Sequence, residues 1–148
     1  MTYSISEMAA RLGVAPSTLR FYDKEGLLPF VQRSDKGIRV FTDQDYEWLQ
    51  IIECLKQTGM QLKDIHTYID MAMEGDSTIE ARLQMFYTQR QRVQEQMEQL
   101  QKTLETVEFK CWYYETAKEL GSTGPMKDMG IEQYPERFRP VLARLKGK

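Results

Sequence analysis

The chain has few of the side chains that carry metal or redox chemistry, because its 148 residues include two cysteines and one histidine. Cys54 and Cys111 lie far apart and form no CxxC pair, so reduced thiols are expected rather than a disulfide framework. With His66 as the lone imidazole, one chain cannot assemble a soft-metal ligand set or an iron–sulfur cluster. We therefore expect no metal site and no cofactor.

The sequence also lacks long apolar runs. No stretch approaches the roughly 18 consecutive apolar residues that a membrane helix needs, and the first residues do not resemble a signal peptide. Neither a Gly-rich phosphate loop nor a nucleophile–histidine pattern is present, so no enzymatic activity is expected. The hydrophobic fraction of 41% and the charged fraction of 28% are typical of a soluble globular protein, for which we expect a cytoplasmic location.

A strong excess of positive charge is missing as well, since the net charge is −2. Phosphate, however, responds to the local surface rather than to the total charge. Residues 1–42 carry six Lys or Arg against four Asp or Glu, and the acidic excess lies further along the chain. The charge balance therefore permits a nucleic-acid partner without requiring one.

Two short helical patterns open the chain. Apolar residues at positions 5, 8, 9 and 12 have the spacing of an amphipathic helix, which Ser4 or Ser6 can cap and Gly13 can end. Pro16 suits the first position of a second helix, and Gly26 suits its end. Two short helices joined by a tight turn predict a helix-turn-helix, whose second helix can enter the major groove of DNA.

The next segments predict a wing and two further helices. FVQRSDKGIRVFT reads as two short strands around an Asp-Lys-Gly turn, which makes a β-hairpin wing bearing Arg33, Lys36 and Arg39. Thr42 caps a third helix that runs to Gly59, and a fourth helix covers residues 62–73. Beyond a long helix, residues 121–125 break the pattern, and residues 137–148 predict one short helix in a tail.

The longest pattern starts at Ile79. Its members step by four and three residues without a break over five heptads, with Arg90 as the polar member. The apolar members of this seam are Ile79, Leu83, Phe86, Val93, Met97, Leu100, Leu104, Val107, Cys111 and Tyr114. A narrow stripe on a rod of roughly 50 Å needs a partner helix. Because the chain supplies no second helix of that length, we expect a homodimer.

The second helix carries candidate DNA-binding side chains. Leu19 and Leu27 supply inward contacts, so the polar and aromatic residues between them are expected to face outward. Arg20 offers a forked donor for phosphate or guanine, and Tyr22 can donate its hydroxyl to a phosphate. A solvated basic face is the alternative, but the wing and the implied dimer favour DNA. The candidates on this helix are Ser17, Thr18, Arg20, Phe21, Tyr22 and Lys24.

Together these elements resemble the MerR family of bacterial transcription regulators. LRFYDKEGLLP, RSDKGIRVFTDQD and LKQTGMQLKDI carry the resemblance, which covers about the first 75 residues closely and the long helix by architecture. It implies a dimer that distorts promoter DNA, so that RNA polymerase can use two promoter elements that are too far apart. The DNA contacts that it implies come from Arg20, Tyr22, Lys24, Arg33, Arg39 and Lys63.

The two thiols narrow the choice of signal within the family. Cys54 in IIECLKQTGM matches the thiol position of the NmlR/AdhR-like regulators, which respond to aldehydes and other electrophiles, and KCWYYE around Cys111 is similar to the same subgroup. Lys56 lies close in sequence and would favour the reactive thiolate. From the residues alone, packing of Cys54 between helices is the alternative. Cys111 lies on the seam and is the second choice as a sensor.

The sequence thus predicts a mostly α protein in three parts. Residues 1–75 form a winged helix-turn-helix DNA-binding domain, residues 76–120 a dimerisation helix that makes an antiparallel coiled coil in the homodimer, and residues 121–148 a short C-terminal tail. Two other functions stay open. One is a DNA-binding regulator that senses a non-covalent ligand near the tail and Trp112, and the other is a coiled-coil adaptor whose basic helix binds a protein.

Overall fold

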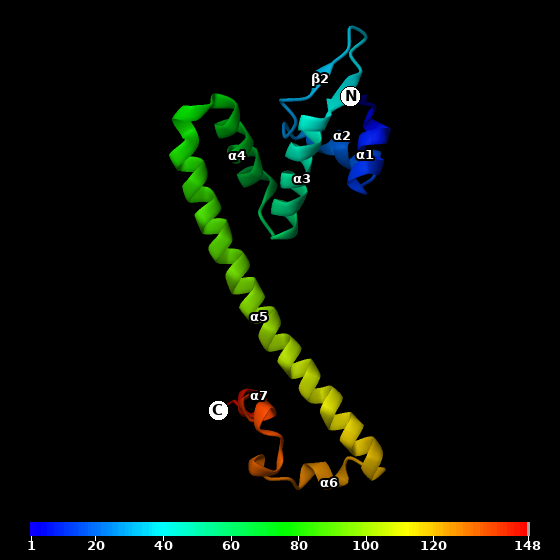
Figure 1. The fold of residues 1–148 in the computed structure, drawn as a ribbon, viewed down its shortest axis with the longest axis vertical. Helices are drawn as coiled ribbons and strands as arrows, with labels where there is room; N and C mark the ends of the chain where they lie inside the picture. Colours follow the sequence, from blue (N-terminus) through cyan, green and yellow to red (C-terminus); the bar gives the residue numbers. More distant parts are fainter. Residues whose placement is uncertain (148) are drawn as a thin grey trace. The chain divides into compact units, whose positions relative to one another are not determined.

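The computed structural model describes residues 1–147 and divides into two compact units. The first unit is Met1–Gln91, and the second begins at Arg92. Figure 1 shows the order of the elements along the chain. The first unit includes the first turns of the long helix, because Met85 packs against the core of the preceding helices. Helices dominate the described part of the chain, as the sequence predicts.

A helix-turn-helix opens the first unit. Helix α1 (Ile5–Leu12) starts at a capping box, in which the side chain of Ser4 accepts from the backbone N–H of Glu7 and the Glu7 side chain accepts from Ser4. Gly13 ends the helix at φ 73°, a left-handed conformation that glycine adopts without strain. Helix α2 (Pro16–Lys24) begins with proline at its first turn. Both predicted helices are confirmed.

A three-stranded sheet with the order β1-β3-β2 follows the helix pair. Strands β2 (Gln32–Arg33) and β3 (Arg39–Thr42) form the predicted hairpin, whose turn includes Gly37 at φ 78°. Strand β1 (Thr2–Tyr3) pairs antiparallel with β3 and was not predicted. This extra strand fastens the start of the chain to the base of the wing.

Two more helices complete the core of the first unit. Helix α3 (Asp43–Gln57) starts at a capping box between Thr42 and Asp45, and it ends two residues before the predicted stop at Gly59. Helix α4 (Leu62–Glu74) ends at Gly75 as predicted, and a short 3-10 helix, η1 (Asp76–Thr78), leads into the long helix. The fully buried core side chains include Met8, Leu19, Tyr22, Leu27, Phe41, Leu49, Ile52, Ile65 and Ile69.

Helix α5 (Ile79–Leu120) is the predicted long helix, and its 42 residues span about 63 Å at 1.5 Å per residue. Its first turns pack on the first unit, and Phe109 is buried in the second. Between Gln89 and Phe109, no side chain of the described chain is buried. In a single chain this middle stretch is therefore a bare helix.

The tail folds back on the end of α5 within the second unit. It contains α6 (Gly124–Lys127), the 3-10 helices η2 (Ile131–Gln133) and η3 (Glu136–Phe138), and α7 (Arg139–Leu145). The predicted tail helix corresponds to α7 and is shorter than expected, with Lys148 lying outside the described residues. The buried members of this second core are Phe109, Tyr134, Phe138, Val141 and Leu142.

Candidate DNA-binding surface and sensor thiol

Helix α2 presents one face to the core and the other to solvent. Leu19 is fully buried, whereas Ser17, Arg20 and Lys24 are exposed and Thr18 is partly exposed. Phe21 leaves 45% of its surface exposed, which is a large apolar area on an otherwise polar face. A cation, hydroxyls and a ring on one short helix suit a surface that lies against phosphates and base edges.

Tyr22 does not point outward as the sequence analysis predicts. It is 1% exposed, its hydroxyl donates to the carboxylate of Glu53, and Lys56 Nζ donates to the same hydroxyl at 2.6 Å. Burial, together with the hydrogen bond to Glu53, raises the pKa of Tyr22 well above its ordinary value. The prediction of a free phosphate donor at this position is therefore wrong in its geometry. The missed signal is the spacing from Leu19, three residues earlier on the same helix face.

Asp23 ties the wing to α2. Its Oδ2 accepts from Arg33 Nη2 and from Arg39 Nε, both at 2.8 Å, and Arg33 Nη1 also donates to the carbonyl of Gly37 at 2.8 Å. The two wing arginines predicted to meet DNA thus share one carboxylate, which the sequence reasoning overlooked. Lys36, by contrast, stands exposed at the turn of the wing.

Lys63 lies exposed near the start of α4 and lines a hollow of about 320 Å³ with Glu25, Leu62 and His66. The His66 ring lies against the backbone at Gly26, where an added Cβ would come 2.8 Å from His66 Nε2. Gly26 has φ +77°, a conformation that favours glycine, and a side chain there would also have to displace the His66 ring. The contact places the end of α2 against α4.

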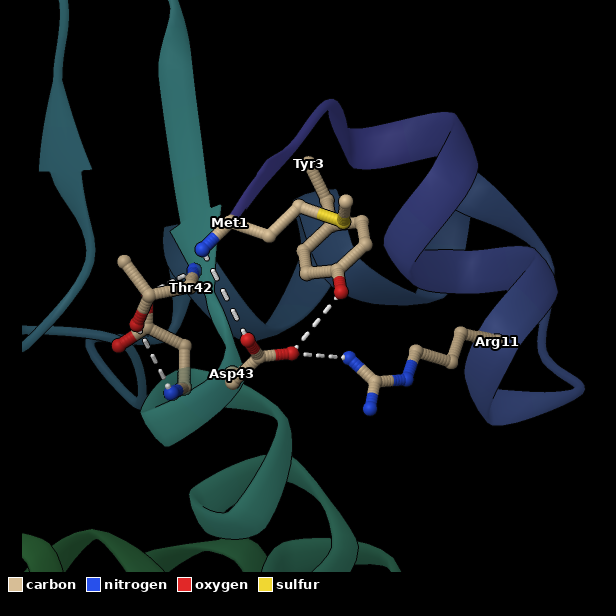
Figure 2. Close-up of polar contacts among 6 residues, drawn as sticks. Met1, Tyr3, Arg11, Thr42 and Asp43 are labelled. Atoms are coloured by element: carbon tan, nitrogen blue, oxygen red, sulfur yellow. Dashed lines mark hydrogen bonds and ion pairs between the residues drawn. The ribbon is translucent and has the colours of Figure 1, made fainter.

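A second polar cluster holds the start of the chain to α3 (Figure 2). Asp43 Oδ1 accepts from Arg11 Nη1 at 2.7 Å and from the hydroxyl of Tyr3 at 2.9 Å, and its Oδ2 lies 3.8 Å from the amino group of Met1. The hydrogen bonds from Arg11 and Tyr3 hold the pKa of the Asp43 carboxyl below its ordinary value. This cluster joins α1, β1 and α3.

The two thiols are both free and both exposed. Cys54 lies on α3, one helical turn after Ile51, which is 37% exposed. Cys54 is therefore not packed between helices of its own chain, which was the alternative drawn from its residue type. Lys56, expected to support the thiolate, instead donates to the Tyr22 hydroxyl. Cys111 lies on α5 among the seam residues.

The seam of α5 is largely uncovered in the single chain. Its exposed members include Met97 at 64%, Leu100 at 68% and Val107 at 54%, while Val93 is partly buried. Phe86 is 38% exposed and packs edge-on against Tyr68 of α4, with ring centroids 5.0 Å apart. The apolar stripe is thus present as predicted, and its first residues also pack against the core of the first unit.

The aromatic residues near the end of α5 pack with the tail. The ring centroid of Trp112 lies 5.6 Å from that of Tyr134 and 5.7 Å from that of Phe138. A separate open hollow of about 370 Å³ lies further along the helix, where Tyr114 and Lys118 line it with residues 121–123. The tail therefore forms an aromatic core around Trp112, with the hollow to one side.

Within residues 1–147, no group of three or more His, Cys, Asp or Glu side chains could hold a metal ion. In the same range, no helix has the length and apolar character needed to cross a bilayer.

A helix-turn-helix with a hairpin wing, carrying outward cations and hydroxyls, defines the chain as a winged helix-turn-helix protein that binds DNA. Residues 3–72 match the MerR HTH family regulatory protein, and residues 46–108 match the family described as MerR, DNA binding. The chain belongs to the MerR family of DNA-binding transcriptional regulators.

Individual relatives agree with this assignment. An uncharacterized HTH-type transcriptional regulator of Haemophilus influenzae is 46% identical over 92% of this chain and 98% of its own length. The HTH-type transcriptional regulator AdhR of Bacillus subtilis is 36% identical over 61% of this chain and 64% of its own length. The crystal structure of HiNmlR, a MerR family regulator lacking the sensor domain and bound to promoter DNA, aligns with a TM-score of 0.80 and 45% identity, covering 88% of this chain and 98% of HiNmlR. Family membership favours the DNA-binding regulator over the protein-binding adaptor.

Proposed function

We propose that the protein binds a promoter duplex as a homodimer in the cytoplasm and changes transcription when an electrophile modifies Cys54. The observation that carries the DNA-binding part is the outward face of α2 beside a wing that Asp23 holds in place. The relation to HiNmlR, which was crystallised on promoter DNA, supports the same partner. Each part of the proposal has its own support and its own test.

In the proposed complex, α2 is the recognition helix, which enters the major groove, and the wing lies along the DNA backbone. Arg20 and Lys24 meet phosphates or base edges, Ser17 and Thr18 approach closely through their small hydroxyls, and Phe21 packs against the sugar edge. Lys36 at the wing and Lys63 on α4 contact the flanking phosphates. Arg33 and Arg39 reach the same backbone while they keep their bonds to Asp23. The Tyr22 ring supports α2 from behind.

The homodimer follows from the uncovered seam of α5. A contiguous apolar stripe along a helix is unfavourable in water and marks an interaction surface. We propose that two copies pair their α5 helices antiparallel, so that the two DNA-binding units read two half-sites. Such a dimer distorts the promoter so that RNA polymerase can use it, as the family resemblance implies.

The sensor part of the proposal places the chemistry at Cys54. Its exposure allows an aldehyde to reach Sγ, where an S–C bond forms as the π bond of the carbonyl breaks, and the proton given up by the thiol ends on the new hydroxyl. The adduct adds bulk to the same turn of α3 that carries Glu53 and Lys56, the two partners of Tyr22. Modification can therefore shift the recognition helix, and resemblance to the NmlR/AdhR-like regulators supports an aldehyde or a related electrophile as inducer.

DNA binding is tested on a duplex selected by the protein from a random-sequence pool. We expect the affinity to fall steeply with salt, because phosphate contacts release counterions. Replacing Lys63 with Ala should weaken binding to all sequences and lower the slope of log K against log salt by about 1. The matched control is Arg92→Ala, an exposed cation on α5. Equal losses in the two variants would contradict the proposed surface.

The sensor thiol is tested by the rate of alkylation, measured for each cysteine by mass spectrometry. We expect Cys54 to react with iodoacetamide faster than Cys111, because Cys54 is exposed and the proposed pairing of the α5 seam covers Cys111. Transcription in vitro with Cys54→Ser should lose its response to an aldehyde, and Cys111→Ser should keep it. Retained induction in Cys54→Ser would refute the thiol switch.

A non-covalent ligand is the second candidate, favoured by the open hollow beside Tyr114 and Lys118. Trp112 itself is packed among Tyr134 and Phe138, so a ligand would bind next to this aromatic core rather than within it. In that case Cys54→Ser would remain inducible, and Lys118→Ala would lose the response.

A further inference from the structure

Two helices meet the end of α3 and its C-cap Thr58 through polar contacts that are partly buried, and this segment, residues 53–58, is called the last turn of α3 below. On one side, Tyr22 of α2 is held between Glu53 and Lys56. On the other side, Gln89 of α5 is 4% exposed and its Nε2 donates to the hydroxyl oxygen of Thr58. The recognition helix and the long helix are therefore fastened to the same turn.

The hydrogen bonds of this turn fix the direction of the Gln89 amide. The hydroxyl of Thr58 donates its one proton to the carbonyl of Leu55 at 2.6 Å, so it can only accept from Gln89. The backbone N–H of Thr58 donates to the carbonyl of Cys54 at 3.3 Å. The Gln89 bond thus ends on the turn that carries the proposed sensor.

The carbonyl oxygen of the Gln89 side chain, Oε1, is in a less favourable position than Nε2. Oε1 is buried and finds no hydrogen-bond partner within residues 1–147. A buried acceptor without a donor destabilises the fold, and a leucine of similar size would fill the position without that penalty.

We propose that the last turn of α3 is a positioning element, through which Gln89 on the dimerisation helix sets the place of the recognition helix on DNA. A displacement of α5 moves Thr58 through its hydrogen bond to Gln89. The same segment of backbone holds Glu53 and Lys56, so Tyr22, which is bonded to both, moves as well. The proposal rests on the proposed function in that α2 binds DNA and α5 pairs with a second copy. It requires no thiol chemistry, although an adduct on Cys54 would act on the same turn.

A double-mutant cycle on DNA affinity tests this inference. Tyr22→Phe removes the hydroxyl at one side of the turn, and Gln89→Leu removes the amide at the other. The dissociation constant for the selected duplex is measured on the reduced, full-length protein for each variant and for the pair. Independent effects should multiply to within about twofold. We expect each single variant to raise the dissociation constant. The dissociation constant of the double variant should be at least fivefold lower than the value obtained by multiplying the two single fold-changes.

A thermal unfolding scan separates positioning from a structural role. Because Gln89→Leu removes an unpaired acceptor, we expect its Tm to stay equal or rise while its DNA affinity falls. A structural role predicts that stability and affinity fall together, and that result would overturn the proposal. If Tyr22→Phe or Gln89→Leu fails to fold, Glu53→Gln and Thr58→Val replace them in the cycle.

The control is Gln99→Leu, the same change at an exposed glutamine of α5. Its effect should multiply with that of Tyr22→Phe to within twofold. Unchanged affinity in Gln89→Leu, or simple multiplication in the main cycle, would overturn the inference. Every sample is reduced, so a negative result in this cycle does not bear on the sensor role of Cys54. Likewise, retained induction in Cys54→Ser would refute the thiol switch without affecting the inference about Gln89.

Discussion

The joint between the wing and α2 gives a quantitative prediction, because one carboxylate holds two arginines. In Asp23→Asn the side chain keeps its size and one acceptor oxygen but loses its charge. Arg33 and Asp23 are 49% and 22% exposed, so this pair contributes about 0.5 kcal/mol as a surface ion pair. Arg39 donates to the same oxygen at the same 2.8 Å but is only 25% exposed, so its more buried bond contributes about 1 kcal/mol. We expect the free energy of unfolding to fall by about 1–2 kcal/mol in total.

The same substitution should act on DNA in two opposite directions. Removing a negative charge from the protein surface strengthens attraction to any duplex, so affinity for unselected DNA should rise. Loosening the wing should lower the preference for the selected duplex, because phosphate contacts fix the position from which bases are read. Binding to both duplexes is measured at one salt concentration, together with urea unfolding at one protein concentration.

The control for this prediction is Asp35→Asn, which removes the same charge from the exposed turn of the wing. We expect it to strengthen binding to both duplexes alike and to leave unfolding unchanged. If Asp23→Asn behaves like Asp35→Asn in both assays, the carboxylate does not hold the wing and the reasoning is refuted.

Three further predictions concern other parts of the molecule. Gly26→Ala should lower the free energy of unfolding by more than the roughly 1 kcal/mol expected for an alanine in the left-handed conformation, because its Cβ would meet His66. Gly37→Ala, at φ +78° with open space around it, should lose only the conformational part. Equal losses in urea unfolding would argue against the contact with His66. The lowered pKa of Asp43 means that its stabilisation is present above about pH 4 and is lost as pH falls through the pKa of the folded protein, so Asp43→Asn should flatten the acid limb of stability against pH; an unchanged acid limb would contradict that assignment. Leu100→Lys places a charge at a seam position that is 68% exposed in the single chain. In sedimentation, the mass should fall from twice the 17.4 kDa of one chain to that of one chain. A retained dimer would rule out the seam as the interface.

Much of the fold could be predicted because its signals are local. The caps at Ser4 and Thr42 and the stops at Gly13 and Gly75 depend on residues within about four positions, and each lies where the sequence places it. Strand β1 had no such signal, since two residues become a strand only by pairing with β3 about 40 positions away. Sequence patterns recover elements whose partners are near in the chain.

The candidate site shows the same division. Exposure of Arg20 and Lys24 follows from the helix period, and the same period should have placed Tyr22 beside Leu19 on the buried face. The arginines of the wing could be found from the hairpin, but their shared bond to Asp23 exists only once the hairpin folds against α2. Charge in a motif therefore identifies candidate contacts without revealing which of them are already occupied.

The uncovered middle of α5 has a consequence for secondary structure if the proposed homodimer forms. Residues 90–108 have no buried side chain in the single chain, and helices in proteins draw most of their stability from the packing of an apolar face rather than from helix propensity. A second copy would supply the packing that sustains this stretch. If the proposed dimer forms, dilution should unfold part of this helix as it separates the two chains, so the helix content of the protein would depend on its concentration.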